Sequence, residues 1–286
     1  IRSHRYRCGL LHYGNSNNIL STSHYLCHMS KEIVVSGIRS TGYLHLGNYF
    51  GAIQNYVLMQ ENYECYFFVA DYHALTTHPD PKELKSNVFR VAAENIASGL
   101  DPNKVALFAQ SDIPEIPELY LMLNMLAYKG ELEKVPTFKE KVRNHTDNVN
   151  AGLLTYPVLM TVDIIIHKAE KVPVGKDQQQ HVEMSRDFVR RFNNLYGVQY
   201  FPEPQPFSFS NKLVNVPSLD GEGKMSKSKP DHTCIYLEDE PDVIRKKVMR
   251  MTTDSGPKEP NSAKPLIIQN VFDMMSLVSS KETLQH

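Results

Sequence analysis

Short apolar runs alternate with longer amphipathic stretches along most of this chain. Runs rich in β-branched and aromatic residues predict buried strands at 32–38, 65–70, 105–110 and 172–174. Between the first two runs, apolar side chains recur every three or four residues from Leu46 to Met59, which predicts a helix. A second helix is predicted from Asp80 or Pro81 to Gly99, and a third ends at Gly197, because glycine suits a helix C-terminus.

Strands that alternate with helices predict a parallel sheet, because parallel neighbours need a crossover connection. The predicted fold class is therefore α/β, a Rossmann-like doubly wound sheet. Residues 114–150 are helical and polar in pattern, so we expect a helical insertion there. Its apolar side chains are expected in the core or in a subunit contact; they are Met122, Met125 and Leu126.

The last third of the chain has weaker patterns. Prolines crowd the stretch from Pro202 to Pro206 and predict a bend. A further helix is predicted to start near Pro241, and the final residues continue in a helical pattern. The chain therefore looks as if it stops inside a helical region.

Composition excludes several classes of protein. Apolar residues make up 41% and charged residues 22% of the 286 positions, which is ordinary for a globular protein. The formal net charge is −1, so any polyanionic partner has to be met by local basic patches. No apolar run approaches the ~18 residues of a membrane-spanning helix. The four cysteines lack a CxxC pair, which argues against a zinc site or a disulfide framework and favours a reducing compartment.

Residues 1–28 differ from the rest of the chain. They hold three arginines and no acidic residue, together with many serines, asparagines, histidines and tyrosines. This composition fits an organelle transit peptide, and it fits equally well upstream sequence that is not part of the natural protein. Met29 then resembles a natural start. We exclude this leader from the fold and leave both interpretations open.

Three glycine-containing turns are candidate phosphate sites. In "SGIRSTGYLHLGNYFGA", Ser36 and Gly37 are expected to end a strand, and "HLGN" at 45–48 to open a helix whose free N–H groups favour phosphate. The stretch lacks both GxGxxG and GxxxxGK[ST], and an ordinary strand–helix turn remains the alternative. In "VPVGKDQQQH", Asp177 is placed to accept hydrogen bonds from ribose hydroxyls.

The third turn is "DGEGKMSKSKPD" at 220–231. Its glycines free the backbone, and Lys224 and Lys227 lie three residues apart. A cationic loop of this kind can clamp a triphosphate and stabilise a leaving pyrophosphate. A solvated surface loop is the alternative for this stretch taken alone.

The stretch "AGLLTYPVLMTVDIII" predicts a pocket. Tyr156, Met160 and Asp163 are spaced four and three apart, so they share one face of a helix. Asp163 lies in an apolar run, and a buried carboxylate is costly without hydrogen-bond donors. An internal partner is one explanation. The other is a pocket with apolar walls in which the acid accepts a hydrogen bond from one N–H group of a ligand. An indole ring, which is large, flat and has a single N–H, fits this pattern.

Taken together, these motifs resemble a known family. "HLGN" with "KMSKS" is similar to the signature pair of class I aminoacyl-tRNA synthetases. From about Ile33 to Asp254 the chain resembles the tryptophanyl-tRNA synthetases, since "GELE", "FKEK", "AGLLTYPVLMTVDI" and "VPVGKDQ" follow in the family's order. "GLLTYP" and "VPVGxDQ" are highly specific to that family.

The resemblance implies roles for individual residues. Tryptophan is expected to contact Ser36, His73, Tyr156, Met160, Asp163 and Gln178. ATP is expected to contact Arg39, Ser40, Thr41, His45, Gly47, Asn48, Gly175, Lys176, Asp177, Val216, Lys224, Met225, Ser226, Lys227 and Ser228. The residues expected to assist catalysis are Lys224, Lys227, His45 and Asn48. Within these sets, Asp163 is expected to bind the indole N–H, Gln178 the α-amino group and Asp177 the ribose, with Val216 and Met225 beside adenine.

The implied reaction has two steps and needs no enzyme nucleophile. The tryptophan carboxylate attacks the α-phosphorus of ATP, and a terminal ribose hydroxyl of tRNA(Trp) then attacks the resulting adenylate. Mg²⁺ is expected on the phosphates, held largely by ATP and water, with no dedicated protein ligands. A homodimer through 114–150 is expected, and no membrane partner.

The resemblance also implies three parts of the chain. They are the leader at 1–28, a catalytic domain at 29–230 with its insertion, and the start of a C-terminal helical tRNA-binding domain at 231–286. Family members often carry glutamine where Arg39 stands and an aromatic residue where Val35 stands. The chain stops soon after Ser279, which leaves tRNA charging in question. The expected compartment is the cytoplasm, with the mitochondrial matrix or another organelle as the alternative.

Three rival functions remain open at this point. A tyrosyl-tRNA synthetase shares the fold and chemistry but differs in "GLLTYP" and "VPVGxDQ". Another adenylyl transferase of the HxGH type would be shorter and would lack "KMSKS". A truncated, inactive synthetase-like binding protein belongs to a different class, and tryptophan-dependent pyrophosphate exchange would dismiss it.

Overall fold

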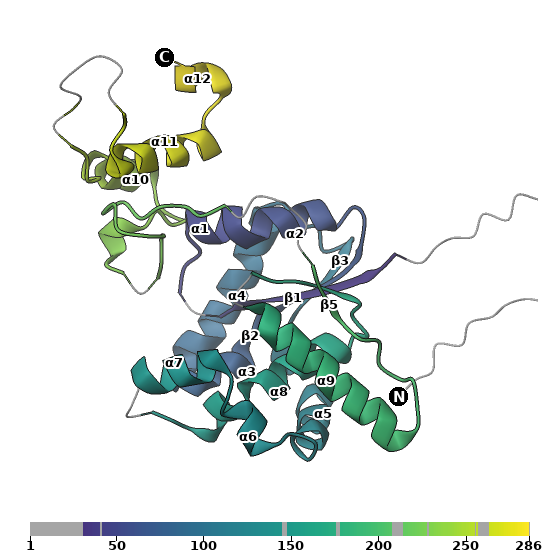
Figure 1. Ribbon diagram of the computed structural model, residues 1–286. Helices are drawn as coiled ribbons and strands as arrows, with labels where there is room; N and C mark the ends of the chain where they lie inside the picture. The colour runs from purple at the N-terminus through teal and green to yellow at the C-terminus, as the bar shows by residue number, and fades with distance from the viewer. Residues whose placement is uncertain are drawn as a thin grey trace, which may run out of the picture. The chain divides into compact units, whose positions relative to one another are not determined.

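The fold is built on a parallel sheet of five strands in the order β3-β2-β1-β4-β5, as Figure 1 shows in part. The strands are β1 Ile33–Arg39, β2 Glu64–Ala70, β3 Val105–Ala109, β4 Lys171–Pro173 and β5 Gln205–Phe207. The chain builds β2 and β3 on one side of β1 and then crosses to β4 and β5 on the other. The predicted doubly wound α/β fold is therefore confirmed.

The computed structural model describes residues 31–40, 42–144, 148–175, 178–207, 214–227, 229–254, 256 and 263–285. The leader predicted at 1–28 lies outside these residues. Among the described residues, no helix has both the length and the apolar character that crossing a membrane requires.

Helices surround the sheet and extend the chain beyond it. The main ones are α1 Leu46–Asn48, α2 Gln54–Met59, α3 Asp71–Ala74, α4 Pro81–Ala97, α5 Glu115–Asn124, α6 Lys129–Leu132, α7 Pro136–Asn144, α8 Ala151–Ile165, α9 Gln179–Tyr196, α10 Pro241–Met249, α11 Leu266–Val278 and α12 Lys281–Gln285. The helices predicted from Asp80 or Pro81, up to Gly197 and near Pro241 all form. Asp80 caps α4 through Lys82 and Glu83, and Gly197 closes α9 with a φ of 63°.

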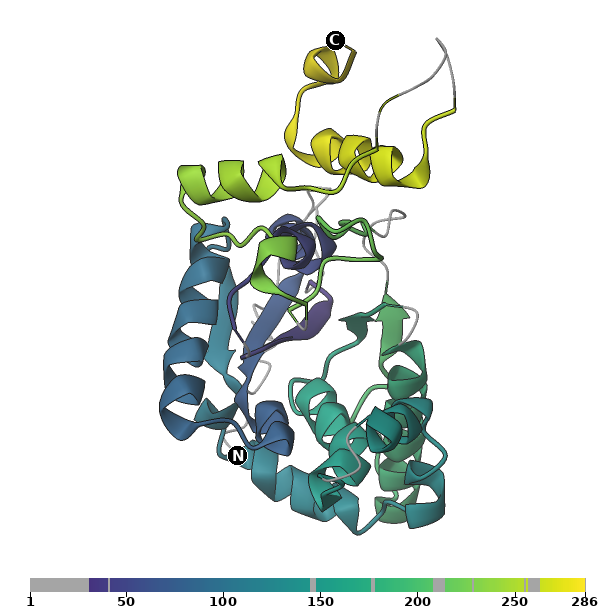
Figure 2. The same cartoon turned by 90° about the vertical axis from the view of Figure 1, so that its left-hand side faces the viewer.

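Both faces of the sheet are covered, as parallel sheets require. Val35 and Phe68 contribute to a core with residues of α5, α8 and α9. Their sequence neighbours Val34 and Phe67 point to the opposite face, where they pack with residues of α2. Figures 1 and 2 show α8 and α9 on one side of the sheet and α2 on the other.

The segment that follows β1 is one helical stretch with an irregular middle. The helix predicted from Leu46 to Met59 forms as α1, a π-helical turn at Tyr49–Ile53, and α2. Phe50 packs from this stretch into a third apolar cluster with Val216 and Met225. This cluster fixes the segment around "KMSKS" against the start of the helix.

Some expectations were wrong in detail. Pro202–Pro206 was expected to form only a bend, yet Gln205–Phe207 is the edge strand β5. Pro206 is tolerated because an edge strand does not need every backbone N–H for the ladder. β1 also runs past Gly37, to Arg39.

The insertion at 114–150 is helical, as predicted, and contains α5, α6 and α7. Its methionines are not core residues, since Met122 is 57% and Met125 is 73% exposed. Leu126 does pack against the core.

Helix α8 carries a proline in its interior. Asn150 caps its first turn by accepting a hydrogen bond from the backbone N–H of Leu153 at 3.1 Å. Pro157 cannot donate a helical hydrogen bond, but it is buried, and the Thr161 hydroxyl donates to its carbonyl at 2.8 Å. Contacts with β1, α5 and α9 hold α8 in place below the sheet.

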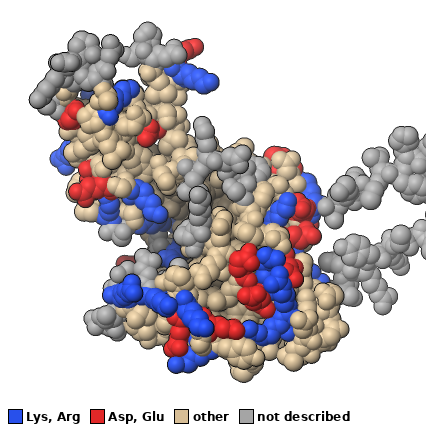
Figure 3. All heavy atoms as spheres, in the orientation of Figure 1, with Lys and Arg blue, Asp and Glu red and all other residues tan. Residues whose placement is uncertain are grey.

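Charged side chains are interleaved over α9 on the face seen in Figure 3. Arg186 and Arg190 both bond Glu203, at 3.3 and 2.7 Å, and Arg186 also bonds Glu183. Such exposed pairs contribute little stability and form no single-sign field over α9.

Candidate active site

Two adjoining cavities lie at the carboxyl ends of β1 and β4. This is the point where the strand order reverses, and ligands of open parallel sheets bind at such a point. One cavity has a volume of about 380 Å³ and is here called the apolar cavity. The other has a volume of about 670 Å³ and contains two lysines, and is here called the basic cavity. Both volumes fall in the range of small-molecule sites. Gly37, Arg39 and Tyr56 line both cavities, so the two share one wall.

The apolar cavity collects the side chains predicted for the amino-acid pocket. Tyr156, Met160 and Asp163 line it together from one face of α8, as their spacing predicted. The remaining members of the predicted set that line it are Ser36, His73 and Gln178. Ser36 shares a hydrogen bond of 2.8 Å with the Tyr56 hydroxyl, which fixes that hydroxyl beside the shared wall.

Asp163 is 3% exposed and already has two partners. Its Oδ2 lies 2.8 Å from Nε2 of His73, and its Oδ1 accepts a hydrogen bond of 2.7 Å from Nε2 of Gln110. Burial raises the pKa of Asp163, while the hydrogen bonds from His73 and Gln110 act in the opposite direction. The partners are a histidine and an amide, and the carboxylate still lines a cavity. The acid therefore has internal partners, and its binding of an indole N–H stays a prediction.

Sequence reasoning missed Gln110. This residue is fully buried directly after β3, and its Oε1 accepts from the backbone N–H groups of Tyr72 and His73 at 3.1 and 3.4 Å. It thereby ties the end of β3 to the start of α3 and to Asp163. The signal in the sequence was a polar residue at the carboxyl end of a parallel strand.

Aromatic rings form the wall around His73. The ring of Tyr156 meets the ring of His73 edge-on at 4.6 Å and the ring of His181 at 5.7 Å. Nδ1 of His181 lies 2.8 Å from Oε1 of Gln178, so this amide is oriented by the base of α9. The apolar cavity is thus bordered by side chains that hold one another in place.

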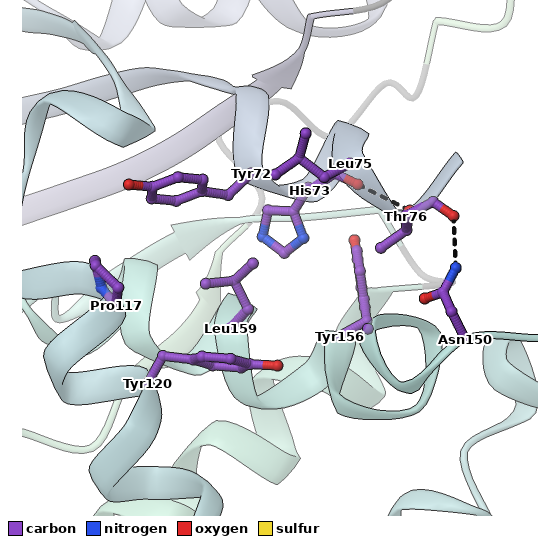
Figure 4. A pocket seen from close by; sticks show the side chains of 10 residues that line it. Tyr72, His73, Leu75, Thr76, Pro117, Tyr120, Asn150, Tyr156 and Leu159 are labelled. Carbon is purple, nitrogen blue, oxygen red and sulfur yellow. Dashed lines mark hydrogen bonds between the residues drawn. The ribbon is translucent and has the colours of Figure 1, made fainter. Parts of the chain in front are cut away.

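A third cavity of about 340 Å³ lies behind this wall, as Figure 4 shows. It shares His73 and Tyr156 with the apolar cavity. Asn150 donates to the carbonyl of Thr76 at 3.0 Å, and the Thr76 hydroxyl donates to the carbonyl of His73 at 2.9 Å. These bonds fix the wall from the far side.

The basic cavity contains the start of α1. His45 caps the helix, because its Nδ1 accepts from the backbone N–H of Asn48 while Oδ1 of Asn48 accepts from the backbone N–H of His45. Burial, followed by the charge of Lys227, lowers the pKa of His45 to about 4. The ring is therefore neutral at pH 7, and its Nε2–H is a donor. A Cβ at Gly47 would lie 2.9 Å from this ring, so the position requires glycine.

Residues 224–227 of the "KMSKS" segment also line the basic cavity. Met225 is buried, and its backbone N–H donates to the carbonyl of Val216 at 2.8 Å. Nζ of Lys227 donates to the carbonyl of Gly42 at 3.2 Å. Burial lowers the pKa of Lys227 to about 8. This lysine is therefore only partly charged in mildly alkaline solution.

The structure places most of the predicted nucleotide residues together. The residues of that set which line the basic cavity are Arg39, His45, Gly47, Asn48, Val216, Lys224, Met225, Ser226 and Lys227. Gly175 lines the apolar cavity instead, because β4 ends one strand away from α1. Ser40 is 1% exposed and is not among the lining residues of either cavity, since the chain turns inward after β1. The predicted residues Thr41, Lys176, Asp177 and Ser228 lie outside the described residues.

Comparison with protein families gives one extensive match. A family model described as tRNA synthetases class I (W and Y) matches residues 29–285. A tryptophan–tRNA ligase of Porphyromonas gingivalis is 56% identical over 255 residues, which cover 89% of this chain and 77% of that protein. Another, from Caldanaerobacter subterraneus, is 41% identical over 253 residues, or 85% of this chain and 76% of that protein.

Solved structures give the same picture. The tryptophanyl-tRNA synthetase from Campylobacter jejuni, complexed with ADP and tryptophan, has a TM-score of 0.79 at 35% identity, over 88% of this chain and 77% of that one. A tyrosyl-tRNA synthetase from Archaeoglobus fulgidus has a TM-score of 0.63 at 20% identity, over 87% of this chain and 72% of that one. At that identity the second likeness shows a shared fold alone.

Proposed function

Because this chain belongs to the class I tryptophanyl-tRNA synthetases, we propose that its two cavities divide the substrates of a tryptophan–tRNA ligase. The apolar cavity takes tryptophan, and the basic cavity takes ATP. The observation that carries this proposal is the wall that the cavities share, formed in part by Arg39 at the end of β1. A carboxylate in one cavity can reach a phosphate in the other across this wall.

Selection of the side chain rests on Asp163. Two of its acceptor positions are used by His73 and Gln110 inside the protein. A carboxylate has about four lone-pair sites, so it can still accept an indole N–H from the cavity. Met160 and Tyr156 supply apolar surface for the ring. Phenylalanine would leave the acid with an unmet acceptor in a dry site, which a site of this kind rejects by about 10⁴–10⁵-fold.

Alignment and charge supply the catalysis of the first step. The tryptophan carboxylate attacks the α-phosphorus, the bond to the bridging oxygen breaks, and pyrophosphate leaves with the electron pair. The neutral His45, the Asn48 amide and the start of α1 donate to phosphate oxygens, while Lys224 and Lys227 neutralise the leaving group. In the second step a ribose hydroxyl of tRNA(Trp) displaces AMP from the adenylate.

ATP brings its own metal in this proposal. The described lining of the basic cavity contains cations and amides and no carboxylate. Within the described part of the chain, no group of three acidic, histidine or cysteine side chains is placed to hold a metal ion. These donors do not fit a protein-held Mg²⁺, so we assign Mg²⁺ to the phosphates and their water ligands.

A second copy of the chain is the proposed partner of the helical insertion. Its exposed apolar side chains are Leu121, Met122, Met125 and Tyr128, which are 57–73% exposed. Patches of this kind on a soluble domain mark interaction sites. Light scattering of the wild type and of Met125→Glu tests the dimer, and equal masses for the two would remove this support. The named relatives are bacterial, and we keep the prediction of a cytoplasm or an organelle of bacterial descent.

Pyrophosphate exchange tests the function directly. Label should move from pyrophosphate into ATP when tryptophan is added, and far less when tyrosine or phenylalanine is added. Exchange with tyrosine instead would favour the tyrosyl rival, and no exchange with any amino acid would favour a binding protein. Charging of tRNA(Trp) is a separate assay, because it adds the second step, for which we propose the domain at 231–286 as the tRNA-binding part.

A further inference from the structure

A carboxylate that plays no part in the mechanism above lies beside the basic cavity. Glu94 is in the last turns of α4, far in sequence from both signature motifs. Its Oε1 accepts from the backbone N–H of Leu44 at 3.4 Å. Its Oε2 is buried and has no hydrogen-bond partner among the described residues. A buried, unpaired carboxylate oxygen costs free energy, so it calls for a compensating role.

Glu94 and Lys227 act on the same turn from two sides. Glu94 binds the turn through Leu44, and Lys227 binds it through the carbonyl of Gly42. Leu44 also accepts, through its carbonyl, a hydrogen bond of 2.8 Å from the backbone N–H of Leu237. The turn leads directly into His45, whose ring lines the basic cavity. The position of that ring therefore depends on contacts that α4 supplies.

Three charged side chains and burial act on the pKa of Glu94. Lys227 and Arg90 lower the pKa of Glu94, and Glu238 raises it, but burial is the largest effect and also raises it. Glu94 in turn raises the pKa of Lys227 against the effect of burial. Lys227 lowers the pKa of His45. Glu94 thus favours the charged form of a half-buried lysine.

We propose that Glu94 is a positioning residue: from α4 it holds the turn at 42–45 that Lys227 also binds, and it supplies a negative charge near that lysine. This rests on the proposed function, since it assigns Lys227 to phosphate. It adds a residue from α4 to a site otherwise built from β1, the helical stretch from α1 to α2, and residues 214–227.

Three variants of the full chain separate charge from structure. Glu94→Gln keeps an acceptor for Leu44 and removes the charge. Glu94→Asp keeps the charge. Glu83→Gln, on an exposed position at the other end of α4, is the matched control. NMR of isotope-labelled lysine, with Lys227→Arg for assignment, measures the titration of Lys227 without any ligand. Exchange kinetics measure kcat/KM for ATP against pH, which reports the free enzyme.

The expected result is a lower pKa of Lys227 in Glu94→Gln and an unchanged one in Glu83→Gln. A decrease of about one unit, from about 8, lowers kcat/KM for ATP about fivefold at pH 8 and about twofold at pH 7. The KM for tryptophan should stay at the wild-type value, and Glu94→Asp should keep most of the alkaline activity. Equal titration of Lys227 in wild type and Glu94→Gln would overturn the proposal, even if the wild type is active. A wild type without exchange would instead overturn the proposed function, and the NMR result would still decide the charge coupling.

Discussion

Replacing Asp163 by asparagine removes one charge from the apolar cavity with little change of shape. Asparagine can accept from Gln110 through its oxygen, and its amide can donate to Nε2 of His73 if the histidine carries its proton on Nδ1. That nitrogen has no hydrogen-bond partner among the described residues, so the tautomer change breaks no existing bond. The proton on Nδ1 then has no acceptor among the described residues, so we expect Asp163→Asn to fold with a stability about 1–3 kcal/mol below that of the wild type.

Asp163→Asn should weaken the use of tryptophan more than the use of ATP. A hydrogen bond to a charged acceptor contributes about 1.5–3 kcal/mol, which corresponds to a rise of about 10- to 150-fold in the KM for tryptophan. The KM for ATP should change less than about twofold, because Asp163 is not among the residues lining the basic cavity. Pyrophosphate exchange with each substrate varied in turn measures both constants.

Two further variants make this test decisive. Asp163→Ala leaves the buried donors of Gln110 and His73 without an acceptor, which should lower the unfolding free energy by about 1–3 kcal/mol for each donor. Asp187→Asn, on an exposed position of α9, controls for loss of a carboxylate. Equal losses for tryptophan and ATP in Asp163→Asn, in a variant that thermal unfolding shows to be folded at the assay temperature, would refute the assignment of this acid to the indole.

Three other substitutions test the remaining geometry. Lys227→Ala should lower the exchange rate at least tenfold and leave the KM for tryptophan unchanged. In the wild type, kcat/KM for ATP should fall above about pH 8, where the lysine loses its proton. A flat alkaline profile would contradict this role of Lys227. Gly37→Ala would place a Cβ 2.5 Å from the ring of Phe68, so we expect a loss of about 1–3 kcal/mol in stability and a higher KM for tryptophan, both measurable by thermal unfolding and exchange. Gly47→Ala would displace the ring of His45 and its cap, which should cost about 0.5–2 kcal/mol and raise the KM for ATP alone; an equal rise for tryptophan would argue against separate cavities.

Local patterns in the sequence were enough to predict most strands and helices and the side chains that α8 contributes to the apolar cavity. The apolar runs predicted four of the five strands to within about two residues, and Gly197 and Asp80 marked helix ends. The spacing of Tyr156, Met160 and Asp163 placed all three in one cavity, because helix periodicity alone decides which side chains share a face.

Long-range contacts were beyond those patterns. One partner of Asp163, Gln110, is 53 residues away, at the end of a strand whose place in the sheet had to be known first. The positions of Gly175, which lines the apolar cavity, and of Ser40, which is buried, also depend on how the sheet is assembled. The strand β5 was missed because its prolines predict a bend. Its pairing with β4 nevertheless makes it a strand, and this pairing is not visible in the local sequence.

The sequence by itself determined the family, four of the five strands with the helices between them, and the side chains of α8 that share one cavity. Those depend on periodicity and on short motifs, which are properties of neighbours in the chain. Only the tertiary structure decided that the two cavities share a wall, that Asp163 is held by His73 and Gln110, and that Glu94 lies beside the turn that Lys227 binds. Those depend on strand order and on the packing of α4 and α8, because groups distant in sequence come within hydrogen-bond reach only after the sheet has been assembled.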